Sequence, residues 1–229
     1  GFQSLIPIAG EPMVVRPLKA LLASRKIAGV RLLTQDPASL APILPRSARW
    51  SLEPSAGTIA ETLEALCNEP DMLWPLLVTT ADHALLDKAM VDQFCADAQG
   101  ADLAVGVVAR SALEKRLPQS RRTWIALRGG QYTGANLFAL GSPRALMAVD
   151  LWRSVEQDRK KGWRLLLQLG WPGLLGLLRI RTLDQTMAAM GRRLGLTLRA
   201  VRLADPLAAV DVDKRQDFEL VTAILERRE

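Results

Sequence analysis

A short strand-like run, Leu76–Thr80, is followed by a lone carboxylate, and it constrains the fold more than any other stretch. Apolar and β-branched residues without polar alternation predict a strand that is buried on both faces. Small residues then lead to Asp82, which places this carboxylate at the carboxyl end of the strand. Ligands of open α/β sheets bind at that edge. Asp82 is therefore a candidate Mg²⁺ ligand, and the alternative is that it only caps the following helix.

The composition fits one large α/β domain. The chain has 229 residues, of which 49% are hydrophobic, so it can bury a full core. Nothing resembles a signal peptide, and Cys67 and Cys95 lack metal-type spacing, so we expect a cytoplasmic protein with reduced thiols. The net charge of +6 favours an anionic partner: a nucleotide, a sugar phosphate, an acidic membrane surface or nucleic acid.

Periodicity predicts alternating helices and strands. The first helix is expected to begin with Pro12 at its first position and to end near Ser24. Further strands are predicted over 30–34, 49–52, 101–110, 123–127, 132–140, 197–203 and 208–213, and further helices after residue 58 and over 87–98 and 217–228. The pair around Gly129-Gly130 is typical of a hairpin, so the pattern indicates a mixed α/β sheet.

A loop of small residues around Gly57 leads into one of these helices. Thr58 is the expected N-cap, and Glu61, three residues later, completes a capping box. The free N–H groups at such a helix start also suit a base or a phosphate. Capping alone explains the pattern, so both interpretations stay open here.

Five motifs in order resemble the MobA-like, GT-A-type nucleotidyltransferase superfamily. They are Leu5–Met13, Gly57–Leu63, Val78–Leu86, Tyr132–Phe138 and Val210–Val221. The resemblance implies a single Rossmann-like domain over 1–229, with a mixed, mostly parallel sheet and helices on both faces. It also implies transfer of a nucleoside monophosphate from an NTP to a sugar, polyol or alcohol phosphate, with release of pyrophosphate. CTP is slightly favoured because Ala60-x-Thr62 resembles cytidylyltransferases of isoprenoid synthesis.

The resemblance also implies a set of site residues. Asp82 and Asp211 would hold Mg²⁺, with Asp213 as second choice, since side chains two apart share a strand face. Asp217 is expected to compensate the dipole of the last helix instead. His83 is expected to be structural, because a phosphate nucleophile is already ionised at neutral pH and needs no general base.

The substrate-binding residues implied by the family fall in two groups. Those for the nucleotide base are Gly57, Thr58, Ala60 and Thr62. Those for the acceptor are Arg121, Arg122, Gly134 and Asn136. The arginines suit an acceptor phosphate, and the alternative is that they are solvated surface residues.

Two departures from the family concern phosphate binding. The family's glycine-rich loop, of the LxAGxxxR type, precedes the Leu5–Met13 motif, and the sequence begins downstream of it. We therefore expect that loop and the central first strand to be missing, which would leave a wide apolar gap in the sheet. Gln3 takes the place of a common Lys, so it could bind the nucleotide without bringing a charge.

An apolar and basic helical insertion is expected over 152–193. Its stretch Leu165–Leu178 carries no charge, but its 14 residues are fewer than the ~20 that span a bilayer. Trp163 and Trp171 with a basic rim suit contact of 159–181 with an anionic membrane, peripherally at the inner membrane. A buried helix pair or a homodimer interface explains the same pattern.

Three other classes of function are compatible with parts of the sequence. A non-catalytic nucleotide or sugar-phosphate binding domain would keep the scaffold and lose the reaction. A membrane-associated GT-A glycosyltransferase would use Asp211 and Asp213 as its DxD pair, although that pair usually lies mid-chain. Nucleic acid is not an expected partner, because the basic residues cluster beside leucines and tryptophans without an RNA-binding signature.

Overall fold

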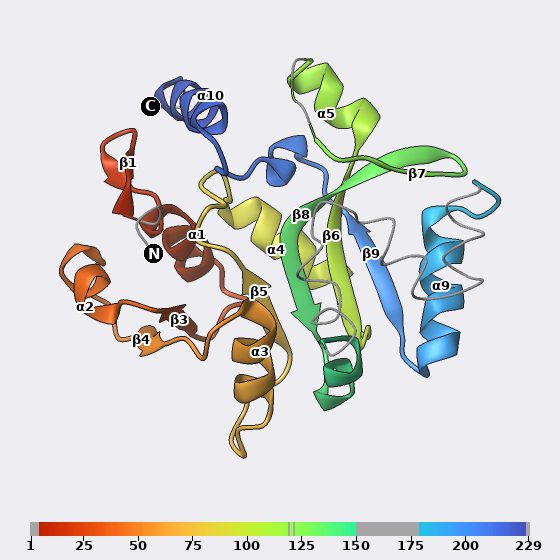
Figure 1. Ribbon diagram of the computed structural model, residues 1–229, viewed down its shortest axis with the longest axis horizontal. Coiled ribbons are helices and arrows are strands. Elements are labelled where there is room, and N and C mark those ends of the chain that lie inside the picture. The colour runs from red at the N-terminus through yellow and green to blue at the C-terminus, as the bar shows by residue number, and fades with distance from the viewer. Residues whose placement is uncertain (1–4, 119, 121, 150–178, 228–229) are drawn as a thin grey trace.

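The chain folds as the α/β domain that its sequence predicts (Figure 1). The computed structural model describes residues 5–118, 120, 122–149 and 179–227. The strands are β1 (Pro7–Ile8), β2 (Glu11–Pro12), β3 (Val30–Thr34), β4 (Trp50–Pro54), β5 (Leu76–Thr79), β6 (Leu103–Ala109), β7 (Ile125–Leu127), β8 (Gly130–Leu140) and β9 (Leu198–Arg202). The helices are α1 (Val15–Ala23), α2 (Pro37–Leu40), α3 (Ile59–Cys67), α4 (Lys88–Asp97), α5 (Arg110–Arg116), α9 (Leu183–Leu194) and α10 (Arg215–Glu226). Short 3₁₀ turns add η2 (Ala41–Ile43), η3 (Pro143–Ala145) and η4 (Pro206–Ala209).

The larger sheet is mixed. Its order is β5-β8-β6-β9, with β7 pairing β8. Strand β8 is antiparallel to β5, β6 and β7, whereas β9 is parallel to β6. Strands β5, β6, β7 and β9 therefore run in one direction, and β8 of the predicted hairpin is the antiparallel strand. Gly129 adopts a φ of 87° in the hairpin turn, a conformation that glycine reaches without a steric penalty.

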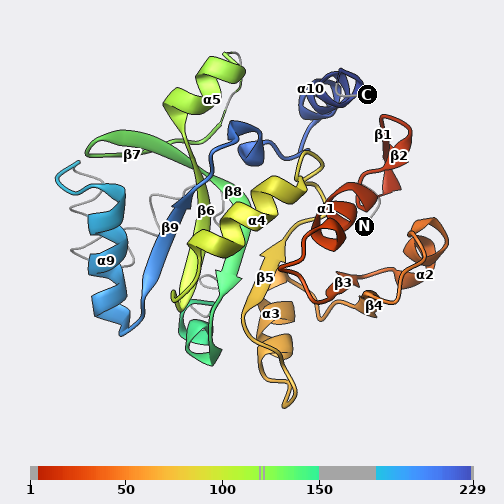
Figure 2. The same cartoon turned by 180° about the vertical axis from the view of Figure 1, so that it is seen from behind.

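The smaller sheet consists of β3 and β4, which pair in parallel with Val30 opposite Trp50. Among the described residues it does not hydrogen-bond to the larger sheet, although it lies beside β5 (Figures 1 and 2). Arg31 of β3 ties it to the rest of the chain. Its guanidinium contacts Glu53 of β4 at 2.5 Å and Glu69, beyond the end of α3, also at 2.5 Å.

Helices cover both faces of the larger sheet, as predicted. Leu76 and Val78 pack with the buried residues of α3, whereas Leu77, between them, packs with the cluster that contains α4. This alternation follows from the two-residue period of a strand. Figures 1 and 2 accordingly show α3 and α4 on opposite sides of the sheet.

Two predicted elements were wrong. The first helix does not begin at Pro12, which lies in β2 opposite Pro7; α1 begins at Val15. The reason is a turn at Ala9 and Gly10, both with positive φ, which folds the chain into a hairpin before the helix. Residues 208–213 form no strand. Pro206 starts the 3₁₀ turn η4, and the chain beyond it runs extended without a partner ladder.

Candidate active site

Three carboxylates meet near the carboxyl end of β5. Asp82 follows β5, and Asp211 and Asp213 lie between η4 and α10. One oxygen from each lies within 4.8 Å of the others. The backbone N–H of Val212 donates to the carbonyl of Asp82 at 3.1 Å, which joins the two segments directly. We call these three residues the acidic corner.

The electrostatics of the acidic corner favour a cation. Burial raises the pKa of Asp82, and the charges of Asp211 and Asp213 raise it further, although the hydroxyl of Thr80 donates a hydrogen bond to the carboxylate. A bound cation removes the repulsion between such carboxylates. Three hard oxygen donors that converge in this way fit a divalent ion such as Mg²⁺. The acidic corner can therefore hold such an ion.

Arg122 and Asn136 contact the acidic corner. The Arg122 guanidinium forms an ion pair with Asp211 and donates to Asp217 at 3.2 Å. The Asn136 amide donates to the other oxygen of Asp211 at 3.0 Å. Both residues therefore lie next to a carboxylate of the acidic corner, and their binding of an acceptor stays a prediction. Asp217 does sit in the first turn of α10, as predicted.

A break in strand register aims Asn136 at this carboxylate. Pairing between β6 and β8 shifts between Val105 and Val107, so β8 bulges between Gly134 and Phe138. Asn136 lies inside this bulge with a φ of 47°, a conformation that asparagine tolerates better than most residues. The sequence signals for this bend are an asparagine and a glycine, Gly134, within one strand, and Gly106 within the facing strand.

His83 lies beneath the acidic corner as a neutral core residue. Its side chain is fully buried, and burial lowers its pKa from 6.5 to about 4. The hydroxyl of Thr79 lies 3.3 Å from its Nδ1. This placement agrees with the structural role predicted from the sequence.

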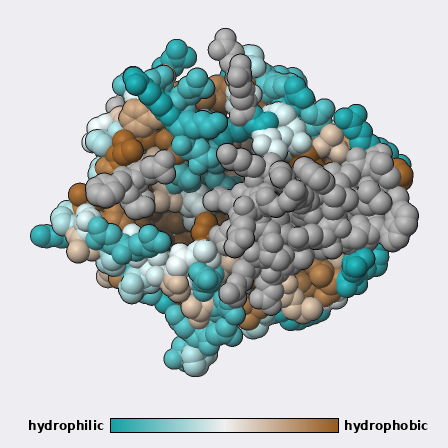
Figure 3. All heavy atoms as spheres, viewed as in Figure 1, coloured by the Kyte–Doolittle hydropathy of each residue, from teal (hydrophilic) through white to brown (hydrophobic). Residues whose placement is uncertain are grey.

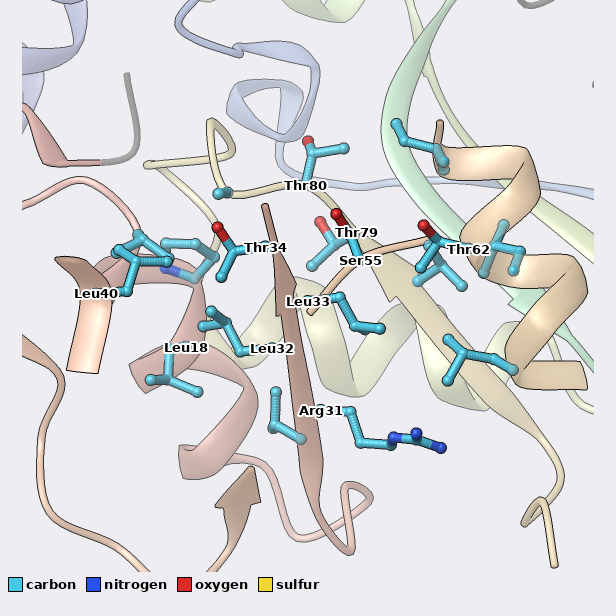
Figure 4. Close-up of a pocket in the computed structure, with 18 of the residues that line it drawn as sticks. Leu18, Arg31, Leu32, Leu33, Thr34, Leu40, Ser55, Thr62, Thr79 and Thr80 are labelled. Carbon is cyan, nitrogen blue, oxygen red and sulfur yellow. The ribbon is translucent and has the colours of Figure 1, made fainter. Parts of the chain in front are cut away.

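A cavity of 340 Å³ lies between β3 and β5, at the break between the two sheets, and reaches Ala81, the neighbour of Asp82. An apolar gap in the sheet was expected from the sequence, and this break lies in it. Figure 3 shows a hollow with hydrophobic walls on this face of the molecule. Leu18, Leu32, Leu33 and Leu40 line one part of it. Hydroxyl groups gather toward the other end (Figure 4), and they belong to Thr34, Ser55, Thr62, Thr79 and Thr80.

The four residues predicted to bind the base occupy different places. Gly57 and Thr62 line the cavity. Thr58 caps α3, where its hydroxyl accepts a hydrogen bond from the N–H of Glu61 at 3.2 Å in the predicted capping box. Ala60 is 2% exposed and packs in the core. The hydroxyls at or just beyond the ends of β3, β4 and β5 were missed, although small polar residues at the end of a predicted strand are a usable signal.

Several predictions cannot be compared with the fold. Gln3, Arg121 and most of 159–181 lie outside the described residues.

Gly134 is exposed on β8, with open space where a side chain would be. Within the described part of the chain, no helix is both long and apolar enough to cross a membrane.

Solved structures share this fold along nearly the whole chain. A hypothetical transferase from Thermus thermophilus is 31% identical, with a TM-score of 0.78, over 94% of this chain and 90% of its own. A 2-C-methyl-D-erythritol 4-phosphate cytidylyltransferase, also from Thermus thermophilus, is 16% identical, with a TM-score of 0.54, over 98% and 93%. A CMP:2-keto-3-deoxy-manno-octonic acid synthetase complexed with CTP is 14% identical, with a TM-score of 0.61, over 99% and 92%. No protein-family model matches the chain, and no curated protein matches it.

Proposed function

The chain belongs to the same family as the hypothetical transferase of Thermus thermophilus, and we propose that it is a nucleotidyltransferase of the MobA-like superfamily. In the proposed reaction, an oxygen of a phosphate monoester attacks the α-phosphorus of an NTP. The bond to the β-phosphate breaks, and pyrophosphate leaves. The observation that carries the proposal is the convergence of three carboxylates beyond the carboxyl end of β5, next to Thr80 and Ala81 of the cavity lining.

The residues of the site have two proposed roles: the carboxylates hold a cation, and the hydroxyls position the nucleotide. Asp82, Asp211 and Asp213 would hold Mg²⁺, which supplies positive charge against the triphosphate. The cavity hydroxyls would hydrogen-bond the base and ribose. Because this reaction asks for little covalent work, placing the two phosphates and neutralising their charge account for most of the catalysis.

Arg122 is proposed to bind the acceptor phosphate. Its guanidinium is now held by Asp211 and Asp217. If Asp211 held a metal ion, Arg122 would be free to bind the acceptor phosphate, a ligand that matches a guanidinium with two parallel hydrogen bonds. The acceptor would then lie on the Asn136 side of the acidic corner.

CTP is the favoured nucleotide. The Ala60-x-Thr62 resemblance and the CTP-binding neighbour both support it.

Contact of 159–181 with an anionic membrane also stays a proposal; it would suit an acceptor that enters lipid synthesis. A homodimer formed through the same region is the competing proposal.

The test measures pyrophosphate release with Mg²⁺, for each NTP against a panel of sugar, polyol and alcohol phosphates. Asp82→Asn removes one carboxylate of the acidic corner, and Asp71→Asn is the control, because it removes an exposed carboxylate outside the corner. Release that needs one pair of substrates, disappears in Asp82→Asn and persists in Asp71→Asn supports the proposal. Nucleotide binding without release from any pair identifies a non-catalytic binding domain. Transfer from a nucleotide sugar identifies a glycosyltransferase.

A further inference from the structure

A second cavity, of 390 Å³, lies away from the acidic corner. It is lined by Arg128, Ile180, Arg181, Gln185, Ala188 and Arg192, and we call it the arginine cavity. Most of these residues belong to α9 or directly precede it, and Figure 1 shows α9 beyond β9, across the larger sheet from β5. We propose that the arginine cavity binds a phosphate group.

Two segments that are distant in the sequence bring the arginines together. Arg128 lies in the turn between β7 and β8, and Arg181 directly precedes the N-cap of α9. The backbone N–H of Arg128 donates to the carbonyl of Arg181 at 3.0 Å, so the turn is fixed against the start of the helix. Arg192 reaches the same cavity from further along α9, on the face that carries Gln185 and Ala188.

Hydrogen bonds within the protein hold residues of the arginine cavity in place. The Gln185 side chain accepts from the N–H of Thr182 at 3.0 Å in the capping box of α9 and from the Arg128 guanidinium at 3.3 Å. One helix cap therefore positions one of the arginines. The Nη1 of Arg181 is buried and has no hydrogen-bond partner in the described part of the chain. A phosphate oxygen is one acceptor that would satisfy this nitrogen, and a water molecule is another.

The charges of the residues that line the arginine cavity favour an anionic ligand over a cationic one. No carboxylate is found among the described residues that line the arginine cavity. Asp184, in the first turn of α9, pairs with Arg202 at 2.8 Å and does not line it. Guanidinium groups match the oxygens of a phosphate with paired hydrogen bonds, and three of them would neutralise a dianion.

The phosphate group can come from a soluble ester or from a lipid headgroup. The volume falls within the range of small-molecule sites. Ile180 is 52% exposed and forms an apolar wall beside the arginines, which is compatible with either source. The inference does not rest on the proposed function, because none of the residues of the arginine cavity belongs to the proposed catalytic machinery.

The test compares two neighbouring arginines of α9. Arg192→Gln removes a charge that lines the arginine cavity, whereas Arg193→Gln removes an exposed charge that does not, so the net charge is the same in both variants. One arm titrates inorganic phosphate into ¹⁵N-arginine-labelled protein and follows the guanidinium NMR signals. The other arm measures binding to phosphatidylglycerol vesicles, with phosphatidylcholine vesicles as the blank.

We expect Arg192→Gln to weaken binding about tenfold, through loss of a charge-assisted hydrogen bond, and Arg193→Gln to change it about twofold or less. If the two variants differ in this way in the titration with inorganic phosphate, the arginine cavity binds soluble phosphate. If they differ only in binding to phosphatidylglycerol vesicles, it binds a lipid headgroup. Equal effects of the two substitutions in both arms would show that only bulk charge matters and would overturn the proposal. Absence of binding in both arms would overturn it as well.

Discussion

The acidic corner and the arginine cavity differ in whether their like charges are compensated by other residues of the protein. In the acidic corner, Asp211 already has internal partners, since Arg122 and Asn136 both bind it. The arginines of the arginine cavity face no carboxylate among the described lining residues. The first site must therefore exchange a protein partner for its ligand, whereas the second can accept a ligand directly. Substitutions should consequently affect stability at the first site and leave it unchanged at the second.

The largest effect is expected for Asp82→Asn. The amide keeps the shape of the side chain but removes the charge that would hold the metal ion, so pyrophosphate release should fall by about 10³-fold or more. Initial rates at saturating Mg²⁺ and nucleotide measure the loss. A rate within tenfold of that of the unmodified protein would remove Asp82 from the site.

Arg122→Gln should destabilise the fold by about 3 kcal/mol, because it leaves Asp211 and Asp217 without their shared, mostly buried cation. The same substitution should tighten Mg²⁺ binding in the absence of nucleotide, since the ion no longer competes with Arg122. Urea unfolding and calorimetric titration measure the two effects. Arg215→Gln is the control: it breaks an exposed pair with Glu219 and should cost about 0.5 kcal/mol or less. Equal losses in the two variants would contradict the internal pairing.

His83 should make stability depend on pH. Its pKa is about 4 in the folded protein and 6.5 as the reference, so below pH 6.5 the unfolded chain binds the extra proton. Stability is therefore lost as the pH falls from 6.5 to about 4, by about 3 kcal/mol at most.

Urea midpoints across this pH range, compared between the unmodified protein and His83→Gln, isolate the contribution of His83. Asp82 titrates in the opposite sense, because its raised pKa favours the folded state as the pH falls. His83 is the only histidine, so its ring signals can be followed by NMR without further variants. A ring that titrates near pH 6.5 in the folded protein would refute the assignment.

The smallest effect is expected for Arg192→Gln. Arg192 is exposed and has only like charges around it in the arginine cavity, so its removal should change the free energy of unfolding by about 0.5 kcal/mol or less. Thermal or urea unfolding at low salt is the measurement. A loss as large as that of Arg122→Gln would erase the difference between the two sites.

Local signals predicted the fold well. Residues 30–34 form a strand with the predicted bounds, and Thr58 and Glu61 form the predicted capping box. In each case a few neighbouring residues determine the structure. The same reasoning placed Asp82 beyond the end of a strand, because a strand and the carboxylate that follows it are adjacent in sequence.

Features that depend on distant segments could not be predicted in this way. The bend at Asn136 comes from a register shift between β6 and β8, which depends on the packing of both strands. The expected strand over 208–213 failed because its apolar residues, Val210 and Val212, are buried in the core without a partner strand. The arginine cavity joins Arg128 to α9, and no local pattern links these two segments.

The double ion pair of Arg31 has a further consequence for the cavity between β3 and β5. Through Glu53 and Glu69, this one side chain links the smaller sheet to the segment that follows α3. Both contacts are partly exposed, so dissolved ions weaken them. Arg31 therefore joins the smaller sheet, which forms one wall of the cavity, to the segment that follows α3. We expect this join to loosen as the ionic strength rises, and the fit of a ligand in the cavity to loosen with it.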